Sequence, residues 1–203
     1  MADLVSGGYP QGTLLKAWFG PNVTQSNLPA RSNAEYLGFG GWTDGALAAT
    51  GVSCSVPIPV DPGTIITNVK VIVGATAEAT GTHSFVALYS GIATPALLGQ
   101  STDDTGAASF AASAVKTVAL TTPYLVKPTD VPNGFLYATV CITAGTIPTA
   151  AVMATATAVT YQLNSSTAPL GHSLTHGSAQ GATAAATIAT PSAKAVAPII
   201  GLT

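Results

Sequence analysis

The sequence predicts an all-β fold, an antiparallel β-sandwich or jelly roll. Short apolar runs with alternating side chains recur at a spacing of about 8–12 residues, which is typical of sandwiches. Gly, Pro, Asp and Thr separate these runs, and none of the stretches between them predicts the long helix that a βαβ unit requires. The strongest runs lie between Thr82 and Thr146, so we expect the centre of the sandwich there.

Several strands and their buried faces follow from the alternation. Gly51–Val60 carries two prolines on its polar face, which predicts an edge strand or the end of a strand, because proline lacks an N–H donor. In Ile65–Val73 the pattern places Ile65 inward and Lys70 outward. Ser84–Ser90 is apolar on both faces, as expected of a central strand that is covered on each side.

The second half of the chain contains two further alternating runs, Phe135–Ile142 and Ala151–Leu163. Residues 164–197 are rich in Ala, Thr, Ser and Gly, a composition typical of disordered low-complexity segments. The end of the chain, Val196–Leu202, returns to an apolar pattern and predicts a closing strand.

The first 45 residues differ from the rest, so we divide the chain into an N-terminal arm at 1–45 and a β-sandwich domain at 46–203. The arm is irregular, rich in aromatic residues, and holds both tryptophans, Trp18 and Trp42. Its Gly and Pro residues permit only short regular elements. An aromatic segment of this kind needs a surface to pack on, and aromatic residues are enriched at interfaces. We therefore favour a docking or oligomerisation arm over a simple cap on the sandwich.

The composition predicts that much of the surface is in contact with other chains. Of the 203 residues, 47% are hydrophobic and only 7% are charged, whereas about 25% are charged in ordinary soluble proteins. Few charges leave a surface prone to association, which favours contact with copies of the chain or with partners. A secreted, Thr-rich adhesin-type domain is a weaker alternative. The six Lys and Arg are scattered and the net charge is −2, so we expect no nucleic-acid partner.

The sequence also predicts no membrane partner and no secretion signal. The opening MADLVSGGYPQG lacks the basic start and apolar core of a signal peptide. No run approaches the ~18 apolar residues that a membrane-spanning helix needs. We therefore expect synthesis in a cytoplasm.

Two cysteines, Cys54 and Cys141, both lie in apolar alternating runs. Buried reduced thiols are the favoured interpretation, because free cysteine is among the most buried residue types. A single disulfide remains open as the alternative.

The sequence gives little support for a metal site. Asp103-Asp104 supplies two carboxylates but too few neighbouring oxygen ligands for Ca²⁺, so a solvated turn is favoured. His172 and His176 would share a face only in a helix, and flanking glycines and the lack of a third ligand at metal spacing argue against zinc. His83 is expected to be an exposed or hydrogen-bonded polar group.

No pattern predicts catalysis. The sequence lacks a Gly-x-Ser-x-Gly elbow, a P-loop and a dinucleotide fingerprint, and its acids are otherwise spread singly. We predict a protein that is not an enzyme, with no catalytic, cofactor-binding or metal-binding residues. Tyrosines could form platforms for a glycan, but their positions inside strands favour packing; the candidates are Tyr89, Tyr124, Tyr137 and Tyr161.

Five segments together resemble the C-terminal β-sandwich domains of virion structural proteins, often minor tail proteins, of tailed phages that infect actinobacteria. The segments are SFVALYSG, LLGQSTDD, KTVALTTPYLVKP, GFLYATV and the closing APIIGLT. The similarity spans residues 65–203 and leaves the N-terminal arm unmatched.

The resemblance implies a non-enzymatic structural component of a virion, either a minor tail protein or a capsid decoration or head-fibre protein. We expect it to contact other virion proteins and other copies of itself, as a homotrimer around an axis. A carbohydrate-binding module for host-surface glycans is the alternative.

Overall fold

The computed structural model describes residues 43–154, 173–194 and 196–203, and within these ranges every regular element is a β-strand. The predicted all-β sandwich is confirmed; the jelly-roll order remains a prediction. The strands are β1 (Thr43–Ala46), β2 (Ser53–Pro59), β3 (Ile65–Ile72), β4 (Ala79–Tyr89), β5 (Leu97–Gln100), β6 (Val115–Leu125), β7 (Phe135–Thr146), β8 (Thr149–Ala154), β9 (Leu174–His176), β10 (Ser192–Ala193), β11 (Val196–Pro198) and β12 (Ile200–Leu202).

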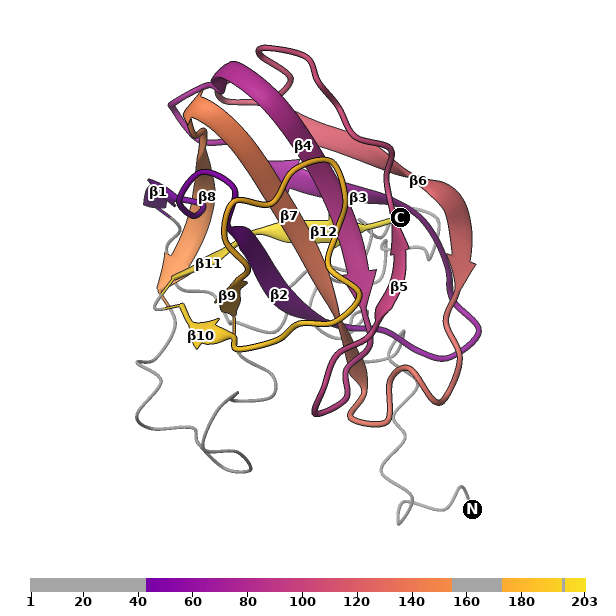
Figure 1. Cartoon of the computed structure of the whole chain (residues 1–203). Coiled ribbons are helices and arrows are strands. Elements are labelled where there is room, and N and C mark those ends of the chain that lie inside the picture. Colours follow the sequence, from indigo (N-terminus) through magenta and orange to yellow (C-terminus); the bar gives the residue numbers. More distant parts are fainter. Residues whose placement is uncertain (1–42, 155–172, 195) are drawn as a thin grey trace, which may run out of the picture. The chain divides into compact units, whose positions relative to one another are not determined.

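One layer of the sandwich is a six-stranded antiparallel sheet with the order β10-β9-β2-β7-β4-β5. Its centre is the long pairing of β4 with β7, which runs from Ala79 opposite Thr146 to Tyr89 opposite Tyr137 (Figure 1). The two strands predicted most strongly from alternation therefore form the middle of the larger sheet.

The opposite layer consists of two three-stranded sheets, β1-β8-β11 and β12-β3-β6. The closing segment joins them, because β11 pairs with β8 and β12 pairs with β3. Between these two strands, the N–H of Ile199 donates to the Ala151 carbonyl and the Ile199 carbonyl accepts from the N–H of Ile72. The predicted closing strand is thus confirmed, divided into two short strands that link both sheets (Figure 1).

Two apolar clusters lie on the two faces of the six-stranded sheet. On β4, Val86 and Leu88 belong to the core between the layers. Their neighbours Phe85, Ala87 and Tyr89 belong to the other cluster. Complete burial of each large side chain stabilises the fold by about 1.5–3 kcal/mol, so the strand is held from both sides. The prediction of a doubly covered central strand is confirmed.

The predicted inward position of Ile65 is wrong. Its side chain is 60% exposed, whereas that of Ile66 is 1% exposed. On one side of β3 the register with β6 shifts between Ile66 and Asn68, and on the other side the N–H groups of Thr67 and Asn68 both donate to the Thr203 carbonyl. This β-bulge changes the phase of the alternation, and a strict period of two cannot anticipate it.

The prolines of β2 lie where the sequence places them, towards the end of a strand. β9 pairs only with Ser53–Ser55, and Pro57 and Pro59 extend past it while still pairing with β7. A missing N–H donor is tolerated there, because β9 does not extend along that edge.

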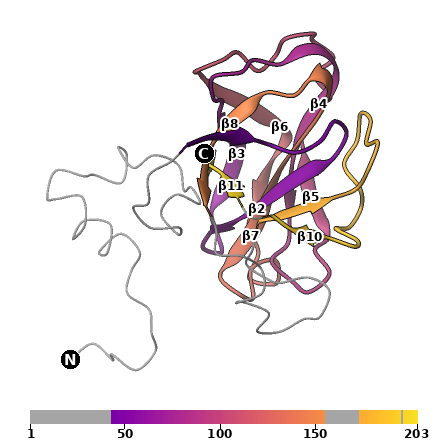
Figure 2. The same cartoon turned by 90° about the vertical axis from the view of Figure 1, so that its left-hand side faces the viewer.

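Residues 173–194, which we call the strap, contradict the expectation of disordered low complexity. The strap supplies β9 and β10 at one edge of the six-stranded sheet, and the residues between these two strands lie across the outer face of the sheet (Figures 1 and 2). Leu174 of β9 and Ile188 join the second apolar cluster. Backbone hydrogen bonds attach it, including Ile188 N–H to the Pro95 carbonyl and Leu97 N–H to the Ala186 carbonyl. Its small residues let the backbone approach the sheet. A segment whose composition is typical of disorder is therefore ordered here.

The predicted boundary at residue 45 falls inside β1, whose Thr43 pairs with Val152 of β8. The rest of the predicted N-terminal arm, residues 1–42, lies outside the described residues. So do residues 155–163 of the strand expected at Ala151–Leu163, together with residues 164–172 of the low-complexity segment.

Candidate functional site

A buried polar group beneath the strap links three strands of the large sheet. The Oγ of Ser55 on β2 lies 2.5 Å from the Oγ1 of Thr139 on β7 and 2.7 Å from the Nε2 of His176 on β9. Ser55 and Thr139 are completely buried, and His176 is 4% exposed. The strand register brings these side chains together, because Ser55 pairs with Thr139 on one side and with Leu174 on the other.

The surroundings of this group keep it uncharged at neutral pH. Burial lowers the pKa of His176 from its ordinary 6.5 to about 4. The edge of its ring meets Tyr89, with ring centroids 5.7 Å apart. Burial also raises the pKa of Tyr89 to about 12 and that of Cys141 to about 11.

A serine hydrogen-bonded to a histidine is the start of a nucleophile–base pair, but the geometry here serves packing. Ser55 has no exposed surface, and Thr139 occupies its second hydrogen bond. Among the described residues, no carboxylate is hydrogen-bonded to the His176 ring to orient it. The group therefore fastens the strap to the sheet, satisfying polar atoms that burial would otherwise penalise by about 1–3 kcal/mol each.

From the sequence, His176 was a candidate only as a metal ligand, but in the structure it is hydrogen-bonded to Ser55. His172 lies outside the described residues, and those residues contain no cluster of three or more potential metal-binding side chains. One signal was present in the sequence: two serines, Ser53 and Ser55, share a face of an otherwise apolar strand. Both are fully buried.

Asp103 and Asp104, for which a solvated turn was favoured, are partly exposed and are both engaged by protein donors. Asp103 Oδ2 lies 2.6 Å from the Nδ1 of His83, and Asp103 Oδ1 accepts from the N–H of Ser84. Asp104 accepts from the N–H of Gly106 and pairs with Lys116 at 3.3 Å. The Gly106 hydrogen bond, with help from Lys116, lowers the pKa of Asp104 although burial opposes this. Protein donors therefore engage these carboxylates, and they fix the loop to β4 and β6.

Glu78 has a structural role that was not predicted from the sequence. Only 2% of it is exposed, and its Oε2 accepts from Ser109 Oγ, Ser109 N–H and Phe110 N–H. The Nζ of Lys116 lies 5.5 Å from the centroid of the Phe110 ring, within cation–π range. Glu78 thus anchors the long connection between β5 and β6.

The tyrosines proposed as glycan platforms have packing roles wherever they are described. Tyr89 and Tyr137 are buried beneath the strap, and the Tyr89 hydroxyl donates to the Ala185 carbonyl. Tyr124 is partly buried and donates to Asp130 Oδ2 at 2.7 Å, which together with burial raises its pKa. Tyr161 lies outside the described residues.

The two cysteines are free and face opposite sides of the large sheet. Cys54 pairs with Val140, the residue before Cys141, and belongs to the core between the layers, whereas Cys141 belongs to the strap cluster. Side chains that point to opposite faces cannot form a disulfide without movement of the backbone. Burial raises the pKa of Cys54 to about 12, so both thiols are protonated and unreactive at neutral pH.

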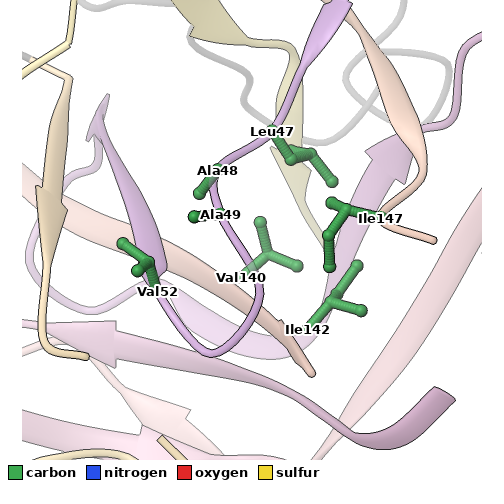
Figure 3. Close-up of a pocket in the computed structure, with 7 residues that line it drawn as sticks. All are labelled: Leu47, Ala48, Ala49, Val52, Val140, Ile142 and Ile147. Carbon is green, nitrogen blue, oxygen red and sulfur yellow. The ribbon is translucent and has the colours of Figure 1, made fainter. Parts of the chain in front are cut away.

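A small apolar pocket lies beside the end of β7 (Figure 3). Its volume is about 10 Å³, close to the minimum that one water molecule needs. The lining side chains are Leu47, Ala48, Ala49, Val52, Val140, Ile142 and Ile147. An apolar space of this size fits no substrate or cofactor.

Comparison with protein-family models, with curated proteins and with solved structures found no match. Across the described ranges there is no helix long and apolar enough to cross a membrane.

Proposed function

We propose that this protein is a non-enzymatic structural component of a tailed-phage virion, which acts by oligomerising and docking onto the particle. A minor tail protein and a capsid decoration or head-fibre protein are both compatible with this role. The resemblance of residues 65–203 to virion sandwich domains motivates the proposal. The observation that supports association most directly is the presence of two exposed aliphatic pairs on the outer face of the sheet β12-β3-β6, one near each end of β3.

Two cross-strand pairs of large aliphatic side chains are exposed on this face. Ile65 is 60% exposed and lies opposite Leu125, which is 54% exposed. Near the other end of the two strands, Ile72 is 38% exposed and lies opposite Val115, which is 59% exposed. Lys70 pairs with Thr117 between them, so the two pairs are separate, and contact with another subunit would cover each of them.

The neighbouring edge supports the same role. β6 is 11 residues long and forms the edge of its sheet, and among the described residues no strand pairs with its outer side. Natural proteins protect such edges with charge, bulges or proline. Here the one charged residue of the strand, Lys116, is paired with Asp104, and the bulge and Pro123 lie in the second half. The segment Val115–Ala119 remains available to another subunit.

The oligomeric state of the full chain tests this proposal. We expect the wild-type protein to sediment as a homotrimer and the double variant Val115→Glu/Leu125→Glu to sediment as a monomer, because two carboxylates per subunit would be buried at the contact. The matched control is Thr183→Glu, which adds a carboxylate at an exposed position of the strap and should remain trimeric. A wild-type monomer that also fails to bind particles lacking it would refute the assembly role.

A further inference from the structure

The strap buries few apolar side chains against the sheet. Among its apolar side chains only Leu174 and Ile188 are almost completely buried, at 1% and 3% exposure. Its strand pairing with β2 covers only Ser53–Ser55. Segments with few buried contacts open locally at lower free energy than the whole domain unfolds. The strap can therefore separate from the sheet while the core between the layers stays intact.

His176 is the buried titratable group at the start of this strap. Around it lie the Ser55 hydroxyl on β2, Tyr89 on β4, and Tyr137 and Cys141 in the cluster contributed by β7. The carboxylate that acts on this cluster is Asp103, which adds to the effect of burial in raising the pKa of Cys141. Asp103 is held 2.6 Å from His83 and is not hydrogen-bonded to His176. The charged side chain near the other end of the strap is Lys194, whose Nζ donates to the Ala46 carbonyl and whose sign also opposes a second cation. Burial of an imidazolium without a counter-ion is strongly unfavourable.

We propose that the strap is an acid-sensitive cover, released from the large sheet when His176 becomes protonated. Release exposes the apolar surface beneath, which includes Phe85, Tyr89 and Tyr137, while the core between the layers remains folded. In the open state the imidazolium is solvated, so the proton favours opening. This inference is independent of the proposed assembly role.

The expected pH range follows from linkage. Well above pH 6.5 the histidine is neutral whether the strap is closed or open, so pH has little effect. As the pH falls from 6.5 towards 4, the open state binds the proton first and the equilibrium shifts towards opening. With a pKa of about 4 in the closed state and an ordinary value in the open state, opening increases about 20-fold between pH 7 and pH 5, and about 300-fold at the acid limit.

Hydrogen exchange of the full-length protein tests the proposal directly. The reporter amides are Gln180, Ile188 and Leu97, whose N–H groups form the hydrogen bonds between strap and sheet. After correction for the intrinsic pH dependence of exchange, we expect their opening to rise about 20-fold from pH 7 to pH 5. Amides of the β4–β7 pairing should remain protected. A parallel rise in those core amides would indicate global unfolding and overturn the proposal.

Two variants isolate the histidine. His176→Gln can keep a hydrogen bond to Ser55 but cannot titrate, so its strap amides should lose the acid-dependent rise. His83→Gln is the matched control, because His83 is hydrogen-bonded to Asp103 rather than to the strap, and it should behave as wild type. The same pH dependence in His176→Gln as in wild type would overturn the proposal.

If His176→Gln does not hold the strap closed, an NMR titration of the wild-type histidines tests the proposal instead. The His176 ring should stay neutral down to about pH 5 in molecules whose strap amides are protected. A ring that becomes protonated above pH 6 while the strap amides remain protected at pH 5 would overturn the proposal.

Discussion

Ser55 and His176 are 121 positions apart in the sequence, yet Ser55 Oγ and His176 Nε2 lie 2.7 Å apart beneath the strap. The contact joins β2 to β9, its neighbour in the large sheet and the first strand of the strap. It explains why a serine occupies an otherwise apolar strand, and it identifies the strap as an integral layer of the domain.

Replacement of Ser55 by alanine should destabilise the strap. Ser55→Ala leaves the Thr139 hydroxyl and the His176 ring without their shared partner, and each unsatisfied buried polar group costs about 1–3 kcal/mol. We expect the free energy of unfolding in urea to fall by about 2 kcal/mol and the strap amides to exchange faster. Thr183→Ala, at an exposed strap position, should change neither quantity. An unchanged urea midpoint in Ser55→Ala would show that the Ser55–His176 contact contributes nothing.

Adjacent isoleucines of β3 should respond very differently to truncation. Ile66→Ala removes a side chain that is 1% exposed and should cost about 2–5 kcal/mol, because it leaves a cavity in the core. Ile65→Ala removes one that is 60% exposed and should change stability by less than about 0.5 kcal/mol. Denaturant unfolding at low protein concentration measures both. Reversed magnitudes would mean that the bulge is misplaced and that Ile65 faces inward.

Glu78 should stabilise the connection between β5 and β6. Glu78→Ala removes the acceptor of the Ser109 and Phe110 donors in a nearly fully buried setting, and hydrogen bonds to a charged group contribute about 1.5–3 kcal/mol. We expect a loss of about 2 kcal/mol in the free energy of unfolding. The comparison variant is Asp104→Asn, whose partly exposed ion pair with Lys116 should contribute less than about 1 kcal/mol. Equal losses in the two variants would contradict the anchoring role.

Both thiols should resist modification in the folded protein. Burial protects Cys54 and Cys141 and keeps them protonated, so a thiol reagent at pH 7 should label both only after addition of denaturant. A reducing agent should leave the melting temperature unchanged, because the two side chains face opposite sides of the sheet. Mass spectrometry after labelling counts the modified thiols, and a stability that drops on reduction would reveal a disulfide instead.

The sequence by itself determined the strands whose side chains alternate without interruption. β4, β7 and the closing segment at Val196–Leu202 were predictable, because a strand with buried residues shows its faces locally in a period of two. The turn at Asp61-Pro62-Gly63 was equally local: Thr64 N–H donates to the Asp61 carbonyl, and Gly63 adopts a φ of 86°, which glycine accepts readily.

The tertiary structure alone decided the features that depend on partners distant in the chain. The bulge beside Ile66 forms where β3 pairs with β6 and with the end of the chain, so the exposure of Ile65 could not be read from β3. The strap has few apolar side chains and is attached largely through its backbone, which leaves almost no pattern in the sequence. His176 acquires its neighbours from three different strands. Local alternation reports which face of a strand is buried, but only the folded chain decides what covers it.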